Sequence, residues 1–522
     1  MSSPQTTLVN TDAPASGRGM WLWGALLVAL YLVSAWLTWG RTLIVTEVWA
    51  LFYAGKPFWE HMEAVRLDLV HPPLMYFLHR VWIGVFGSND NAVKVLPLVI
   101  NIPALLLFVA AAKRMTKHWR AASLGFCTLY VAARVPATTR MYGLGLLLAI
   151  GAIHFWNRWR ERPTNGRLLA WCAAMVLLVY THFFGLLLLA GFAVAACLGG
   201  PRRRAFLTAS VAAGASWLPW LLYVLPVYRE RGVETNLWWV SIFNNNPVIA
   251  LLTLPAALLG DLSAGRLPQR FVYLAAIAVH VCLFAAAMFY VRGNLWRLAS
   301  PPTPVDRIRA LLVITAVPVL VMFAFSVFRT SALNIRFLLG IVPFYWLLIG
   351  TLAEAGRRPG QVMLYILVLP WAFVSAGQSL RMLSRPAGVH LAAERIAAAA
   401  QSGDHIFSSA GLCNSFYWEW KHRLGRTPEG FECLADESDT KRPNQIQERG
   451  LEQTSRLCIL PRQPIAQVDV QGHRRVWIVA SEAAIIARAG QRIQSLGYRR
   501  DFEGRNGAVV VERFAAPDTS GP

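Results

Sequence analysis

The feature that most constrains this chain is a series of apolar runs, each close to 20 residues long, that fills most of its first 380 positions. About 20 apolar residues is the length that an α-helix needs to cross the hydrocarbon core of a bilayer. We predict eleven spans, at about 20–39, 95–112, 121–134, 140–156, 168–182, 184–199, 205–227, 271–291, 310–328, 337–355 and 361–380. Only 15% of the residues are charged, against about 25% in soluble proteins, which excludes a disordered or fibrous chain. The predicted fold class is mainly α, a polytopic transmembrane helix bundle over residues 20–380.

Positive charge predicts the orientation of this bundle. Five short basic blocks between spans hold 17 Lys and Arg in 47 residues, whereas the alternate connections hold 13 in 112. The positive-inside rule places the basic blocks, and with them an N-terminal tail at 1–19, in the cytoplasm. An odd number of spans then puts the C-terminus outside. Because the excess charge belongs to an apolar region, it indicates membrane orientation and membrane lipids as partners, and no nucleic-acid binding.

Two further apolar stretches would change this count if each were a span. Pro72–Gly87 is short and carries His79 and Arg80 in its middle, and an internal Arg is costly in hydrocarbon. We predict that it is an amphipathic helix in the external interface, within a long first external loop at 40–94. Pro247–Gly260 is interpreted as re-entrant or interfacial. The alternative is that both are short true spans.

Residues 381–522 are polar and balanced in charge, and they predict a small α/β domain outside the membrane. Strands are expected at His405–Ser409, Arg475–Ala480 and Ala508–Arg513, with helices at Ala392–Gln401 and Glu482–Leu496. Three cysteines fall in this tail, Cys413, Cys433 and Cys458, and one disulfide among them is possible in an oxidising compartment. No Cys or His spacing typical of a metal site occurs, so no metal ligand is predicted.

Acidic residues of the membrane region gather on the predicted external side. Eight of its twelve acids lie there, and five of these, Glu47, Glu60, Glu63, Asp68 and Asp90, belong to the loop at 40–94. Basic residues flank the same boundary at Arg140 and Arg336. Carboxylates and arginines at one membrane face suit a reaction in which a base activates an acceptor while cations hold a phosphate.

Several of these residues stand in motifs that resemble the GT-C glycosyltransferases. Thr46–Tyr53 followed by Asp68-Leu-Val-His71-Pro-Pro-Leu74 is similar to the first external loop of the family 39 group, which is related to protein O-mannosyltransferases and lipid A aminoarabinose transferases. Further along, Arg140-Met-Tyr142, then Tyr180-Thr-His182-Phe-Phe-Gly185 and Ile335-Arg336-Phe-Leu-Leu resemble elements that follow in the same order. The resemblance covers about 20–355, and its most specific parts are His71-Pro-Pro-Leu and Arg140-Met-Tyr.

This resemblance implies an integral membrane enzyme of GT-C fold, in a bacterial inner membrane with its C-terminus in the periplasm. Such an enzyme transfers a sugar from a polyprenyl-phosphate-linked donor to a glycan, lipid or protein acceptor, inverts the anomeric centre, and needs no metal or other cofactor. The implied catalytic residues are Glu47 and Asp68, and the implied substrate-binding residues are His71, Arg140, Tyr142, His182 and Arg336.

Two departures from the family pattern affect the implied base. Thr46 stands where the family has the Asp of an Asp-Glu pair, and Thr138 stands where an acid usually precedes Arg140. A Thr hydroxyl is no general base near neutral pH. Either Glu47 alone is the base, or Asp68 has taken over the role, or the chain is no longer a transferase.

Each candidate also has a structural interpretation. The acids could cap interfacial helices, or Glu47 could pair with Arg41; Arg140 and Arg336 could anchor their spans at the interface, and the histidines and Tyr142 could be packing residues. Two other functions stay open: a transporter or flippase of lipid-linked saccharides, and a catalytically lapsed protein that binds a glycan. Transporters usually carry mid-membrane charges, whereas the predicted spans here are nearly free of them.

Overall fold

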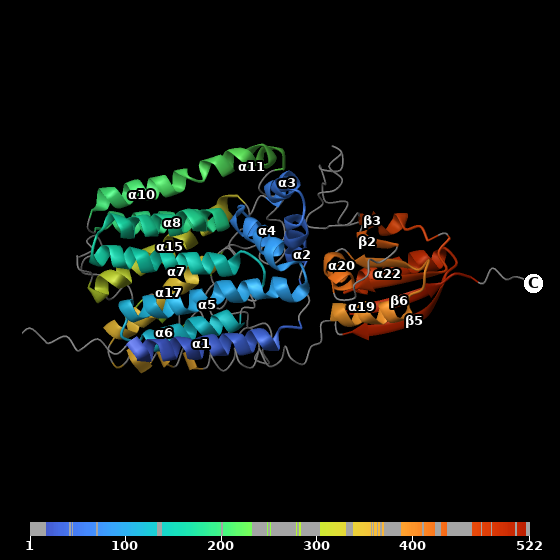
Figure 1. Cartoon of the computed structure of the whole chain (residues 1–522), viewed down its shortest axis with the longest axis horizontal. Coiled ribbons are helices and arrows are strands. Elements are labelled where there is room, and N and C mark those ends of the chain that lie inside the picture. Colours follow the sequence, from blue (N-terminus) through green and yellow to red (C-terminus); the bar gives the residue numbers. More distant parts are fainter. Residues whose placement is uncertain are drawn as a thin grey trace, which may run out of the picture.

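The computed structural model describes most of the helical region and most of the C-terminal tail (Figure 1). The described residues are 17–40, 43, 45–68, 71–132, 138–199, 202–231, 303–329, 338–356, 388–409, 412–422, 430–435, 462–470, 472–481, 483–506 and 509–517, with single positions between 248 and 285 and between 358 and 369. Arg41, Arg336 and Cys458, as well as nearly all of Pro247–Gly260, therefore lie outside the description.

Long helices lie side by side and form a bundle, which Figure 1 shows from its side. Its helices are α1 (Gly17–Leu37), α5 (Asp90–Met115), α6 (Trp119–Ala132), α7 (Tyr142–Glu161), α8 (Asn165–Thr181), α9 (Phe184–Cys197), α10 (Arg203–Ala215), α11 (Leu218–Arg231), α15 (Pro304–Phe328) and α17 (Val342–Ala355), the last preceded by the 3-10 turn η3 (Leu339–Ile341). Three of them begin at a side-chain cap: Asn89 and Thr164 accept backbone N–H groups at the starts of α5 and α8, and Thr303 forms a capping box with Asp306 at α15.

Within the described residues, three helices are long and apolar enough to cross a membrane, namely those at Arg18–Leu37, Asp90–Met115 and Val305–Phe328. The pair α10 and α11, bent by 40° between them, would make a fourth. The mainly helical class is confirmed, while the number of eleven spans stays a prediction. One boundary is corrected, because α5 begins at Asp90, inside the loop predicted at 40–94, where Asn89 caps it.

Small residues bring the helices of this core close together. An added Cβ at Gly125 on α6 would overlap the ring of Trp346 on α17, and one at Gly191 on α9 would lie 3.1 Å from the Cα of Ile314 on α15. Such positions are typical of helix pairs in membranes, where close van der Waals packing replaces the hydrophobic effect.

Three short helices occupy the end of the bundle that faces the tail (Figure 1). They are α2 (Val45–Ala54), α3 (Phe58–Asp68) and α4 (Leu74–Phe86), all from the predicted first external loop. Helix α4 begins two residues after the start of the helix predicted at Pro72–Gly87 and ends one residue before its end. It buries Met75, Tyr76 and His79 on one side and exposes Val81 and Val85 on the other.

The tail contains a six-stranded sheet with the order β3-β2-β1-β4-β6-β5. Its elements are α19 (Gly388–Ala399), β1 (His405–Ser409), α20 (Cys413–His422), β2 (Phe431–Ala435), β3 (Arg462–Pro464), β4 (Arg475–Ala480), α22 (Ala483–Ser495), β5 (Arg499–Asn506) and β6 (Val509–Ala515). Strands β3, β2, β1 and β4 are parallel, and β6 and β5 continue the sheet antiparallel. Strands β1 and β4 have the predicted bounds, whereas α19 begins four residues before the predicted helix at Ala392–Gln401.

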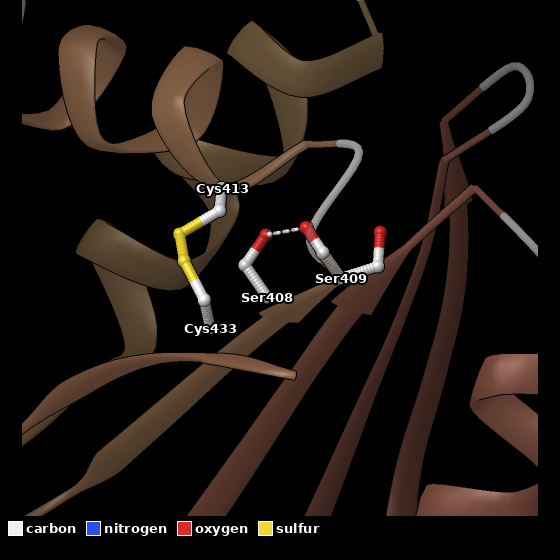
Figure 2. Close-up of a disulfide and its surroundings, with 4 residues drawn as sticks. All are labelled: Ser408, Ser409, Cys413 and Cys433. Atoms are coloured by element: carbon white, nitrogen blue, oxygen red, sulfur yellow. Dashed lines mark hydrogen bonds between the residues drawn. A yellow bond between two sulfur atoms is a disulfide. The ribbon is translucent and has the colours of Figure 1, made fainter. Parts of the chain in front are cut away.

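A disulfide ties this tail together. Cys413 at the start of α20 bonds to Cys433 on β2, with 5.8 Å between their Cα atoms, and Figure 2 shows it beside Ser408 of β1. This is one of the pairings that the three tail cysteines allowed.

Candidate functional site

Glu47 is a buried carboxylate of the loop predicted at 40–94. It lies in the first turn of α2, where the positive end of the helix dipole favours an acid, and none of its side chain is exposed. One of its oxygens, Oε1, accepts the backbone N–H of Thr139 at 2.6 Å and lies 3.3 Å from the hydroxyl of the same residue. Glu47 thus joins α2 to the segment that leads into α7.

Arg140 follows directly in that segment and contacts the histidine of the His-Pro-Pro motif. Its Nη2 donates to Nδ1 of His71 over 3.2 Å, and both residues are more than nine-tenths buried. Because an arginine only donates, Nδ1 of His71 is the acceptor, which places the proton of a neutral ring on Nε2. His71 therefore orients the guanidinium.

His182 and Tyr142 complete this group. His182 caps the end of α8, and its Nδ1 accepts the backbone N–H of Phe184 at 3.1 Å. Its ring stands edge-on to His71, with centroids 5.4 Å apart, and the ring of Tyr142 at the start of α7 lies 6.4 Å away. Four predicted substrate-binding residues from three distant parts of the sequence thus lie within one cluster.

The two remaining candidates are less fully described. Asp68 is the last residue of α3, and its side chain lies outside the described part of the structure. Arg336 lies wholly outside it. The roles assigned to Asp68 and Arg336 remain predictions from the sequence.

His79 belongs to this site although it was not predicted as a site residue. It is 1% exposed on α4, and the charges of Arg140 and Glu47 both act on its ring. Burial lowers the pKa of His79 to about 4, and the backbone of Thr139 and the Glu47 carboxylate oppose that shift only in part. The ring is therefore neutral near pH 7. The signal that could have found it is helical spacing, because His79 follows Met75 by four residues on the buried side of α4.

Other polar residues of the loop hold the backbone in place. Arg80 donates to the carbonyls of Ala54 and Lys56 and thereby closes the C-terminal end of α2. Lys94 at the start of α5 pairs with Asp90 at 2.6 Å and donates to the carbonyl of Trp39 beyond α1. The first set of contacts joins α4 to the end of α2, and the second joins α5 to the segment that follows α1.

The cluster offers a proton acceptor and a cation, the two groups needed to activate a nucleophile and to hold an anion. Among the described residues, no three His, Cys, Asp or Glu side chains are arranged to bind a metal ion.

Comparison with known proteins identifies the fold. No protein-family model and no curated protein sequence matches the chain. The crystal structure of ArnT from Cupriavidus metallidurans, solved with bound undecaprenyl phosphate, matches 98% of this chain and 100% of its own, with 14% identity and a TM-score of 0.53. The chain has the fold of ArnT. The fold that the motifs implied is thereby confirmed.

Two structures of the Archaeoglobus fulgidus oligosaccharyltransferase are also similar, at a lower level. One, tethered to an acceptor peptide, matches 77% of this chain and 62% of its own, with 10% identity and a TM-score of 0.38. The other, in complex with an inhibitory peptide and a dolichol-phosphate, matches 96% of this chain and 75% of its own, with 9% identity and a TM-score of 0.36.

Proposed function

We propose that this chain is an integral membrane glycosyltransferase that transfers a sugar from a polyprenyl-phosphate carrier to an acceptor at the external face, in bacteria the periplasmic face of the inner membrane. The observation that carries the proposal is the meeting of Glu47, Arg140, His71 and His182 at the end of an ArnT-like bundle. The undecaprenyl phosphate bound to ArnT supports a lipid-linked donor of the same chemistry.

In this proposal Glu47 is the general base. Its carboxylate takes a proton from the acceptor hydroxyl or amine, whose oxygen or nitrogen then forms a bond to the anomeric carbon of the sugar. The bond between that carbon and the phosphate oxygen breaks, and the electron pair leaves with polyprenyl phosphate.

Arg140 offsets the negative charge on the departing phosphate. A guanidinium held in a buried site acts more strongly on an anion than one in water, since little solvent competes for the charge. His71 contributes by fixing Nη2 of Arg140, so that its orientation does not depend on the substrate. The site thus combines a base with a preoriented cation.

A catalytically lapsed glycan-binding protein is the second candidate, and the Glu47 contact favours it. A carboxylate that holds the Thr139 backbone at 2.6 Å already has a structural task. If that is its whole role, loss of its charge will weaken the fold and leave any glycan binding in place.

The first experiment is a profile of lipid-linked sugars in cells that carry the intact chain, no chain, Glu47→Gln or Glu60→Gln. Glu60 is the matched control, an exposed acid of the same loop that pairs with Lys56. We expect one polyprenyl-phosphate sugar to accumulate without the chain and with Glu47→Gln, and not with Glu60→Gln. That lipid would also identify the sugar. An unchanged profile in all four strains would overturn the transferase proposal.

A further inference from the structure

Helix α20 of the tail is shared between two separate cores. Its Trp420 packs inside the tail against Phe416, Ile406 and Val389. Its Trp418, two residues earlier, packs instead against Val48 of the first external loop and Val93 of α5. Two residues correspond to about 200° around a helix, so the two indoles leave α20 on opposite sides. Figure 1 shows α20 between the sheet and α2.

Helix α2 is held on two sides by such contacts. Val48 and Leu51, one turn apart, lie in the same apolar cluster as Trp418, and Val48 is fully buried. Trp49 and Ala50 face the other way, into a cluster with residues of α3, α4 and α11. Glu47 precedes Val48 directly. A helix of ten residues is only marginally stable by itself, so this packing determines how α2 is rotated about its axis.

Two contacts fix helix α20 within the tail. The disulfide from Cys413 to Cys433 fixes its start to β2 (Figure 2). Near its other end, fully buried Glu419 lies 3.2 Å from Nδ1 of His390 on α19. Trp418 therefore lies on α20 between two residues, Cys413 and Glu419, that attach this helix to the rest of the tail.

We propose that Trp418 is a positioning residue that sets the rotation of α2 and through it the place of the Glu47 carboxylate. The inference rests on the proposed role of Glu47 as base. If Trp418 positions Glu47, the tail contributes to transfer by holding the base in place. Rotation of α2 by about 20° would move a side-chain atom about 5 Å from the axis by roughly 1.7 Å. A displacement of about 1 Å at a reacting group can cost about 100-fold in rate.

The test compares the full chain in lipid nanodiscs with Trp418→Ala, Trp418→Phe and Trp420→Ala. Transfer is measured with whichever member of a panel of undecaprenyl-phosphate-linked hexoses and pentoses the intact protein uses. Amide hydrogen exchange of residues 45–54 reports on α2 independently of activity, and thermal unfolding reports on stability. Trp420 is the matched control, since it is a buried indole of the same helix that contacts only the tail core among the described clusters.

With Trp418→Ala we expect kcat to fall by about 100-fold, KM for the donor to stay within about twofold, and exchange in α2 to become faster. Trp418→Phe, which keeps an aromatic ring in the cluster, should recover kcat to within about fivefold of the intact chain. Trp420→Ala should lower the unfolding temperature and, below it, leave kcat within about threefold. If the apparent pKa in the pH profile of kcat differs between Trp418→Ala and the intact protein, the environment of the base has changed.

Equal losses of kcat in Trp418→Ala and Trp420→Ala would overturn the inference, because tail stability would then explain both. Unchanged exchange in α2 with Trp418→Ala would overturn it as well. A failure of the proposed function looks different, since the intact protein would then transfer no sugar from any donor of the panel.

Discussion

The contact between Arg140 and His71 gives a quantitative test of how the site holds its cation. Arg140→Gln removes the charge that we propose to face the leaving phosphate, and His71→Ala removes the acceptor that holds the guanidinium over 3.2 Å. Loss of one preoriented donor to a developing anion typically lowers kcat by about 100- to 1,000-fold. We expect this range for Arg140→Gln.

The expected effect of His71→Ala follows from the burial of the pair. A net hydrogen bond that involves a charged group contributes about 1.5–3 kcal/mol, which is roughly a 10- to 150-fold change. Both partners are more than nine-tenths buried, so little water replaces the lost acceptor. If His71 acts through Arg140, removing it from the Arg140→Gln protein should change kcat by less than about threefold.

The assay is a double-mutant cycle on kcat/KM for transfer in nanodiscs near neutral pH. The coupling energy should be about 1.5–3 kcal/mol. Arg66→Gln is the control: this arginine of α3 lies over the Tyr223 ring and pairs with Glu63, away from the cluster, and its loss should leave kcat within about threefold. Additivity of the two site substitutions within about 0.5 kcal/mol would refute the view that His71 works by orienting Arg140.

Three further predictions concern stability, each measured by thermal or denaturant unfolding. Gly125→Ala forces a Cβ into the ring of fully buried Trp346 and should cost about 1–3 kcal/mol, whereas Gly145→Ala, with open space around it, should stabilise α7 slightly. Cys413→Ser opens a loop closed by a disulfide over a sequence separation of 20 and should cost the tail about 3 kcal/mol; full stability without the disulfide would contradict this. Burial lowers the pKa of His405 from 6.5 to about 4, so the unfolded chain binds the proton first, and stability should fall by up to about 3 kcal/mol as pH drops from about 6.5 to about 4. His405→Gln should flatten that pH dependence, and an equally steep profile would show that another group titrates.

The sequence predicts those elements whose pattern is decided locally. The length of the apolar runs predicts the bundle helices, and the bounds of β1 and β4, which are buried along almost their whole length, are also predicted from the sequence. The sequence does not predict the elements whose structure depends on contacts with distant parts of the chain. Strand β5, Arg499–Asn506, is rich in charge and lies at the edge of the sheet, where β6 is its one partner among the described strands, and β3 is three residues long. Helix α20 is short and mixed in character, since it divides its apolar residues between two cores.

The motifs point to the residues of the site, but the contacts among them depend on how the bundle packs. Nothing in the spacing of 47, 71, 140 and 182 says that Glu47 meets the backbone of Thr139, or that His71 accepts from Arg140 and stands against His182. His79 was not predicted as a site residue, because the charge of the neighbouring Arg80 indicated a helix at the membrane interface. In the structure Arg80 donates to the end of α2, whereas His79 is buried. The cluster of Trp418 with residues of α2 joins positions about 370 residues apart, so no local sequence pattern predicts it.

The two threonines that depart from the family pattern fit an anionic donor in one respect. Thr46 and Thr138 place hydroxyls where the family pattern has carboxylates, so this stretch of the sequence carries two fewer negative charges beside Glu47 and Arg140. A polyprenyl-phosphate sugar brings its own negative charge into a buried space, where each additional carboxylate would repel it strongly. With fewer acids nearby, less negative charge opposes the proposed donor beside Arg140, and the proposed base, Glu47, is held by the N–H of Thr139. Restoring an acid with Thr138→Asp should therefore raise KM for the donor, whereas Thr138→Asn, of the same size without the charge, should leave it nearly unchanged.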